Sequence, residues 1–415
     1  MPRIGIITAA ALIVATLCHH VAACPFCPPS SPTLAEQLAE SDVGVLVEWL
    51  RSEDAPDDQS EARTDFRVVE VLRSFETGPK KSQTVSVPFL RQGKPGDLFL
   101  LMAKRVEGIT EWSLPIEVTE ISAAYVKQAP SPERPATERL PFFLRFLESP
   151  DQLLANDAFA EFSRAKYEDV VAIKDRLPRD KLRKWLEDPE TTKMRLGFYG
   201  LLLGLCGNAD DGLFLAAKVF PPTAEDEVRL GLDGMMAGYV LLTGETGLNR
   251  LVEQKLNDTQ QPDGDVYAVI NLLRFLWQFA ADRVPQANVA AALRPLVDRP
   301  QFAEVAIVDL ARWKDWSVLD KIIARYGEPP FETPEAKRKA ITFALACIKD
   351  GGNDPQPGTP AKQARRFIER LRTEDPEMLR NAERFFAPRP QANPDPTTKS
   401  PVGFFLVPHY WCGRC

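Results

Sequence analysis

The stretch FAEVAIVDLARWKDWSVLDKIIARYG, residues 302–327, shows the pattern that organises most of this chain. Apolar residues recur every three or four positions, so that Ile307 and Leu310 fall on one side of the first segment. A short polar break then precedes a second apolar segment that ends in glycine. This spacing predicts two consecutive amphipathic helices, at 302–311 and 317–324.

The same arrangement of a long apolar helix, a short turn and a shorter helix recurs at spacings of roughly 30 to 40 residues, as in helical repeats. We expect further pairs at 194–206 with 211–218, 224–242 with 248–256, 265–279 with 289–297, and 334–349 with 360–371. Residues 302–327 resemble a HEAT-type repeat, and this resemblance implies an α-solenoid over residues 140–387. The alternative is a helical domain without true repeats.

Aromatic and cysteine side chains within these helices have a structural interpretation. At helical spacing, Ile270, Leu273 and Trp277 are expected in the core rather than around a cofactor, as are Trp313 and Trp316. Cys206 and Cys347 lie in apolar helices, where free cysteines behave as small hydrophobic residues.

Residues 41–126 show the period of two that is typical of strands. Val43, Val45 and Val47 alternate with other residues, and similar short runs recur up to Val118 between glycine, proline and aspartate. Five short strands in this span predict a small antiparallel β-barrel or sandwich.

This part of the chain resembles the OB-type barrel of tissue inhibitors of metalloproteinases and netrin-like modules. The resemblance rests on Cys24, a second cysteine close by, "D-V-x-V" from Asp42 and "G-D-x-x-L-L" from Gly96. In that family the amino-terminal cysteine chelates the zinc of a target protease, and Cys24 is the matching position. The cysteine spacing differs here and residues 28–126 contain no partner cysteines, so we carry over the barrel shape and not protease inhibition.

The first 23 residues resemble a cleaved export signal. One basic residue precedes the uncharged apolar run from Ile4 to Leu17, and small residues occupy 21–23. The run is too short for a membrane-spanning helix, and an amino-terminal anchor is the alternative. Val-Ala-Ala-Cys also resembles a bacterial lipobox, which would place a lipid anchor on Cys24. We therefore expect an exported protein of the periplasm or cell surface, with no transmembrane segment in the mature chain.

Composition excludes several classes of function. The net charge of −7 becomes −8 when Arg3 is removed with the signal, and this argues against a nucleic acid partner. Of three histidines only His409 would remain in the mature chain. Because histidine is the usual general base near neutral pH, most hydrolase mechanisms are disfavoured. The sequence assigns no catalytic residue and no cofactor other than a candidate zinc ion.

The remaining boundaries follow from changes in composition. Residues 24–40 are a cysteine-containing lead with a short helix, opened by a capping box from Thr33 to Glu36. A linker rich in proline and charge spans 127–139. Residues 388–415 form a proline-rich tail with an apolar end, which we expect to dock against the first domain.

Two Cys-x-x-Cys pairs, Cys24 with Cys27 and Cys412 with Cys415, stand at opposite ends of the chain. Three interpretations stay open. The first is structural disulfides, which exported proteins form, and bonds that join the two ends would close a loop of nearly the whole chain. Two such pairs also match a four-cysteine zinc site, with His409 as a substitute ligand. Finally, Cys-Pro-Phe-Cys resembles the Cys-Pro-Tyr-Cys of glutaredoxins, which implies redox chemistry. Lipidation of Cys24 would remove one thiol and exclude the first two interpretations in their four-cysteine form.

The sequence as a whole predicts a non-catalytic binding or scaffold protein of the bacterial cell envelope, with a protein or envelope macromolecule as its partner. The alternative is a redox or zinc-dependent activity where the two cysteine pairs meet. The order of segments also resembles exported bacterial proteins whose mature chains start with CPFC, a resemblance that implies no activity.

Overall fold

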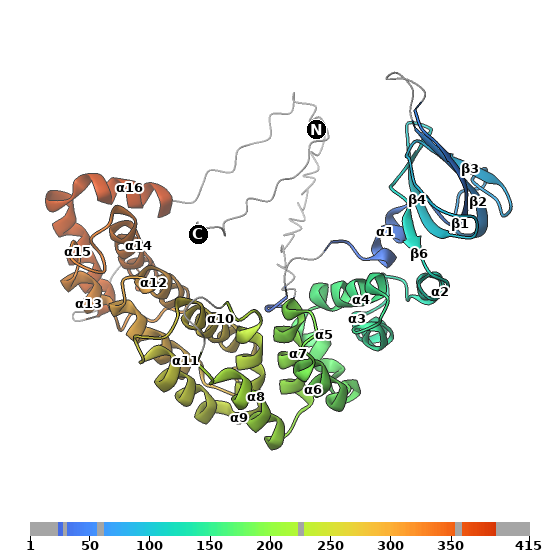
Figure 1. Cartoon of the computed structure of the whole chain (residues 1–415). Coiled ribbons are helices and arrows are strands. Elements are labelled where there is room, and N and C mark those ends of the chain that lie inside the picture. Colours follow the sequence, from blue (N-terminus) through green and yellow to red (C-terminus); the bar gives the residue numbers. More distant parts are fainter. Residues whose placement is uncertain (1–23, 28–30, 56–61, 223–227, 353–358, 387–415) are drawn as a thin grey trace, which may run out of the picture. The chain divides into compact units, whose positions relative to one another are not determined.

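The computed structural model describes residues 24–27, 31–55, 62–222, 228–352 and 359–386. The chain divides into two compact units, residues 1–295 and 296–415, and each is described by itself. The first unit contains a small antiparallel sheet followed by helices, and the described part of the second is mainly helical (Figure 1). This confirms the predicted order of a small β domain before a long helical region.

The described residues form one six-stranded antiparallel sheet. Strands β3-β2-β1-β4-β5 are neighbours in that order, and β6 pairs with β4. The strands are β1 (Val43–Glu53), β2 (Arg63–Arg73), β3 (Thr84–Val87), β4 (Leu98–Val106), β5 (Ile109–Trp112) and β6 (Ile116–Val118). The sequence predicted five strands. The sixth arises because residues 113–115 separate β5 from β6, whereas the alternating pattern places them within one strand.

The predicted alternation places aliphatic side chains on one face of the sheet. Val43, Val45 and Val47 of β1 are fully buried, and Val45 lies opposite Leu101 of β4. Phe66 meets Phe99 edge-on with ring centroids 5.3 Å apart. Val71 of β2 lies opposite the buried Val45 but is itself 37% exposed, and the β1–β2 register is irregular on both sides of this pair.

Helix α1 (Leu34–Glu40) covers part of the other face of the sheet. Its start is the predicted capping box, in which Thr33 and Glu36 each accept the other's backbone N–H. Gly44 of β1 admits Leu38, since a β-carbon at Gly44 would lie 2.1 Å from the Leu38 Cδ1 atom. The sequence therefore fixes both the start of α1 and its close approach to the sheet.

Ten helices follow the sheet in the described part of the first unit (Figure 1). They are α2 (Glu120–Gln128), α3 (Ala136–Phe143), α4 (Gln152–Arg164), α5 (Tyr167–Ala172), α6 (Arg179–Glu187), α7 (Lys193–Cys206), α8 (Ala209–Val219), α9 (Leu232–Leu251), α10 (Asp263–Phe279) and α11 (Gln286–Leu293). Short turns of helix occupy Leu144–Phe146, Lys174–Arg176, Val252–Leu256 and Arg294–Asp298. The linker expected at 127–139 includes the end of α2 and the start of α3, so only 129–135 are irregular.

Helices α7 and α9 approach each other through glycine. Gly200 and Gly204 of α7 face Gly238 of α9, and a β-carbon at Gly238 would lie 2.0 Å from the Gly200 carbonyl oxygen. Gly244 has φ +62° and interrupts α9, close to the glycine turn predicted between 242 and 248. The backbones of α7 and α9 are therefore in direct contact, which holds α7 in a fixed position.

The described helices of the second unit are α12 (Ala303–Arg312), α13 (Leu319–Ala324), α14 (Pro334–Asp350), α15 (Pro360–Glu374) and α16 (Pro376–Phe386). The pairs predicted at 302–324 and 334–371 coincide with α12 to α15, whereas α16 was not predicted. The HEAT-type repeat stays a prediction. No helix in the described ranges has both the length and the apolar character needed to cross a bilayer.

The large apolar residues of the helices that the sequence assigned to the core are only partly buried as expected. Ile270 and Leu273 are fully buried. Trp277, Trp313 and Trp316 are half-buried. The Trp316 indole N–H donates to Asp350 at 2.9 Å, so this ring keeps a polar contact at the surface. These tryptophans therefore cover the edge of the core instead of filling it.

Candidate functional site

A solvent-open groove of about 540 Å³ lies in the first unit, between α1, β6, α4 and the start of α7. We call it the α1–α4–α7 groove. Its lining is mostly apolar and consists of Ser31, Pro32, Leu34, Gln37, Ile116, Leu153, Asn156, Asp157, Phe159, Ala160, Thr192, Met194 and Arg195. Figure 1 shows α1 between the sheet and α4, and both helices contribute lining residues.

The buried carboxylate of Asp157 joins three elements at the base of the groove. One oxygen accepts the backbone N–H of Leu34 at 2.7 Å, and the other accepts the Tyr125 hydroxyl at 2.6 Å. Burial raises the pKa of Asp157 above its ordinary value, although these two hydrogen bonds act in the opposite direction. Asp157 therefore fixes the start of α1 against α4 and α2.

A second buried carboxylate stands one helical turn further along α4. Glu161 is 2% exposed and forms an ion pair with Arg139 of α3. Burial raises the pKa of Glu161, and the neighbouring Arg139 charge partly opposes this effect. The pair ties α3 to α4 behind the groove, and neither group lines it.

Arg195 of α7 forms the opposite wall and is only 3% exposed. Its guanidinium donates to the Leu147 carbonyl and to Glu148, both at 2.9 Å, and to the Asn156 side-chain oxygen at 2.7 Å. Glu148 also accepts the hydroxyl of buried Tyr199, and burial raises the pKa of that tyrosine. The Arg195 charge is thus paired within the protein.

Two side-chain amides on the groove keep unused hydrogen-bonding atoms among the described contacts. Gln37 uses its nitrogen to donate to the Pro32 carbonyl, which leaves its Oε1 as an acceptor. Asn156 uses its oxygen to accept from Arg195, which leaves its Nδ2 as a donor. Leu153 and Met194 line the same groove, and Met194 is 50% exposed. The groove therefore offers apolar side chains together with one donor and one acceptor.

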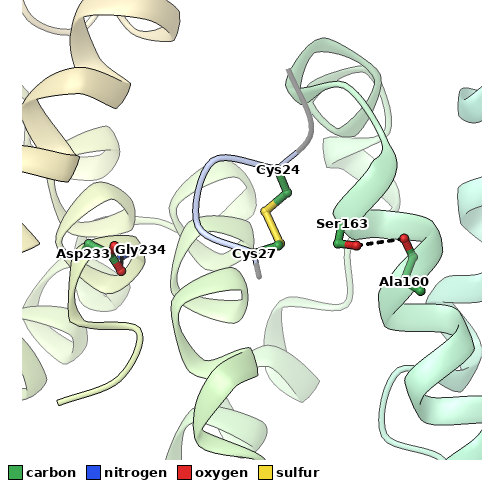
Figure 2. The surroundings of a disulfide bond; sticks show 6 residues. All are labelled: Cys24, Cys27, Ala160, Ser163, Asp233 and Gly234. Carbon is green, nitrogen blue, oxygen red and sulfur yellow. Dashed lines mark hydrogen bonds between the residues drawn. A yellow bond between two sulfur atoms is a disulfide. The ribbon is translucent and has the colours of Figure 1, made fainter. Parts of the chain in front are cut away.

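The cysteine pair at the start of the described chain is a disulfide between Cys24 and Cys27, whose Cα atoms lie 5.3 Å apart (Figure 2). The bond is local and does not join the two ends of the chain, so the end-joining disulfides and the four-cysteine zinc site stay predictions. While it is formed, neither sulfur is the thiolate that zinc binds. A lipid thioether on Cys24 would need the same sulfur. Cys412, Cys415 and His409 lie outside the described residues, as does the tail expected to dock.

The carboxylates and the remaining cysteines of the described residues do not form a metal site. In the described ranges, no group of three His, Cys, Asp or Glu side chains is placed to hold a metal ion. Cys206 is half-buried and Cys347 is buried, and burial raises both thiol pKa values to about 11. These two cysteines are therefore poor nucleophiles at neutral pH.

No family model matches this chain, and comparison with curated proteins and with solved structures gives no match. The candidate site therefore rests on its own geometry.

Sequence reasoning did not find the groove. Its base depends on the contact of Asp157 with Leu34, which joins positions 123 residues apart. One signal was present: Asp157 and Glu161 stand four residues apart in α4, with only the apolar residues 158–160 between them. Carboxylates on the apolar side of a helix require partners, and this indicates a buried polar contact.

Proposed function

We propose that this chain is an exported, non-catalytic binding protein of the bacterial cell envelope, and that the α1–α4–α7 groove holds an extended, mainly apolar peptide segment of a partner protein. The groove carries the proposal. It is concave, mostly apolar and provided with a few fixed polar atoms, which is the usual composition of a binding site. Export is supported by the signal-like residues 1–23.

The polar atoms of the groove suit a peptide backbone. Each peptide unit offers one N–H donor and one C=O acceptor. The Gln37 Oε1 atom can accept such an N–H, and the Asn156 Nδ2 atom can donate to such a carbonyl. Leu153 and Met194 lie along the same groove and would contact apolar side chains of the segment.

The same arrangement argues for binding rather than catalysis. Both oxygens of Asp157 already accept hydrogen bonds, and Arg195 is held by its own partners. A catalytic pair needs a nucleophile within hydrogen-bond reach of a base. The lining contains no cysteine, histidine or lysine, and its single carboxylate is turned to structural use.

A peptide panel tests the proposal. Fluorescent short peptides in which apolar residues alternate with Thr or Ser would be titrated against the whole mature chain by fluorescence anisotropy. The same peptides with Glu at the apolar positions serve as controls. We expect saturable binding of apolar peptides only, with hydrogen-exchange protection confined to α1, α4 and α7. Equal binding of both sets, or protection elsewhere, would refute the proposal.

A further inference from the structure

The disulfide at the front of the chain belongs to a loop that is docked by other contacts. Phe26 is 9% exposed and its ring lies 5.1 Å from that of Phe275 in α10. Tyr167 of α5 meets the same Phe275 ring edge-on at 5.2 Å. The backbone N–H of Cys24 donates to the carbonyl of Ser163, in the last turn of α4, at 3.0 Å. The loop is therefore held at Cys24 and at Phe26 without help from the sulfur atoms.

The disulfide itself contributes little to the fold. It closes a loop of only four residues, from Cys24 to Cys27. In the chain-entropy model such a small loop stabilises the folded state less than the larger loops of most structural disulfides do. A bond with a small structural contribution, in a loop already docked by Phe26, is suited to being opened and closed.

The two cysteines differ in exposure. Cys24 is 7% exposed, whereas Cys27 is half-buried. The more exposed residue is the one that an external thiolate would attack, which makes Cys24 the leaving group. Exchange is faster when the leaving thiol has a low pKa.

In the uncleaved chain, the surroundings of Cys24 disfavour a negative charge on its sulfur and so disfavour Cys24 as a leaving group. Its backbone nitrogen meets the carboxyl end of α4, where the helix dipole is negative. A positive charge next to the sulfur would favour the thiolate and make Cys24 a better leaving group. Cleavage after Ala23 creates that charge, because the nitrogen of Cys24 becomes an α-ammonium group. The carbonyl of Ser163 is already placed to accept a hydrogen bond from it.

We propose that the Cys24–Cys27 disulfide is a thiol–disulfide exchange site for a dithiol partner protein, and that removal of residues 1–23 activates it. This proposal rests on the proposed export, because it requires cleavage after Ala23, and it does not depend on the groove. It deepens the redox interpretation by assigning a direction to the exchange and a role to the new amino terminus.

The exchange is balanced by the partner's two thiols. A partner thiolate bonds to the Cys27 sulfur, the bond between the two cysteines breaks, and its electron pair leaves on the Cys24 sulfur. The partner's second thiolate then attacks its own sulfur in the mixed disulfide and releases Cys27 as thiolate. The partner is oxidised to a disulfide, and Cys24 and Cys27 take up two electrons and two protons from it.

The first test compares two amino termini. A site-specific protease would release the chain with Cys24 as its first residue, and the control would retain Ala22 and Ala23. Both would carry Cys412→Ser and Cys415→Ser. Reduction by dithiothreitol at pH 7 would be followed by quenching, alkylation and peptide mass mapping. We expect the mature chain to react about fivefold faster; equal rates would overturn the activation by cleavage.

The second test measures direction. In the same background, the oxidised chain would be mixed with excess reduced glutathione and quenched in acid after short times, and peptide mass mapping would locate the glutathione adduct. We expect the adduct on Cys27 about tenfold more often than on Cys24, because the external thiolate attacks Cys27 and Cys24 leaves. Cys206 and Cys347 are free thiols and serve as internal controls that should carry no adduct. Equal amounts of adduct on Cys24 and Cys27 would overturn the assignment.

Discussion

The groove and the cysteine loop both depend on α4, yet they differ in what they leave available. In the first half of α4, the side chains of Asp157 and Asn156 are hydrogen-bonded inside the protein. At its end, Ser163 holds a loop whose disulfide is partly open to solvent. Polar groups that are already hydrogen-bonded are suited to binding a partner, whereas a partly exposed disulfide is suited to thiol–disulfide exchange. The predictions below test whether the two ends of α4 are separable in this way.

The largest expected effect is at the groove wall. Arg195→Ala leaves Glu148 and Tyr199 without their cation, so we expect the free energy of unfolding to fall by about 3–5 kcal/mol, as for a broken buried pair. The matched control is Arg164→Ala, which removes an exposed pair with Glu36 and should cost under about 1 kcal/mol. Urea unfolding of both variants measures the difference. Similar losses would show that the Arg195 network is not what holds this wall.

The next effect concerns the anchor of the cysteine loop. Phe26→Ala removes a ring packed on Phe275 and should lower the free energy of unfolding by about 3 kcal/mol. Pro25 is exposed in the same loop, so Pro25→Ala is the control and should change stability little. A neutral result for Phe26→Ala would mean that the loop is not docked in solution.

Removal of the disulfide should have a smaller effect than removal of Phe26. The double variant Cys24→Ser with Cys27→Ser should lose about 2 kcal/mol, as estimated for a four-residue loop. Thermal and urea unfolding under non-reducing conditions compare it with the unsubstituted chain. A loss well above that of Phe26→Ala would identify the bond as a structural staple and weaken the exchange proposal.

The smallest effect is a change of slope with pH. Because burial raises the pKa of Asp157, the folded state binds more protons than the unfolded state above the ordinary pKa of 3.8. The free energy of unfolding should therefore fall as the pH rises through this range. Asp157→Asn mimics the protonated form and should make the slope shallower, although Glu161 contributes with the same sign. Unfolding measured from pH 4 to 7 checks this, and an unchanged slope would contradict the assignment.

Local patterns predicted local structure well. The alternation of Val43, Val45 and Val47 placed β1 correctly, and the Thr33–Glu36 spacing placed the start of α1. The helix expected at 265–279 is α10, Asp263–Phe279. These features depend on neighbours within one or two turns of the chain, and the sequence states them directly.

Long-range contacts were not predictable in the same way. The groove exists because Asp157 meets Leu34 and because Arg195 meets Glu148, and neither pairing leaves a periodic trace in the sequence. The glycine contact of Gly200 with Gly238 is also invisible until α7 and α9 are placed side by side. The sequence singled out Cys24 and Cys27 as a pair but could not show that Phe26 docks between them on α10.

The most direct test of the central claim is peptide binding by two charge variants. Met194→Glu places a carboxylate on the groove, whereas Leu213→Glu places one on α8, where Leu213 is 72% exposed and away from the groove. We predict that Met194→Glu weakens binding of the apolar peptide by at least about tenfold, because the bound segment would bury an unpaired charge. Leu213→Glu should change it by less than about twofold. Unchanged binding by Met194→Glu, or an equal loss in Leu213→Glu, would contradict the assignment of the groove as the binding site.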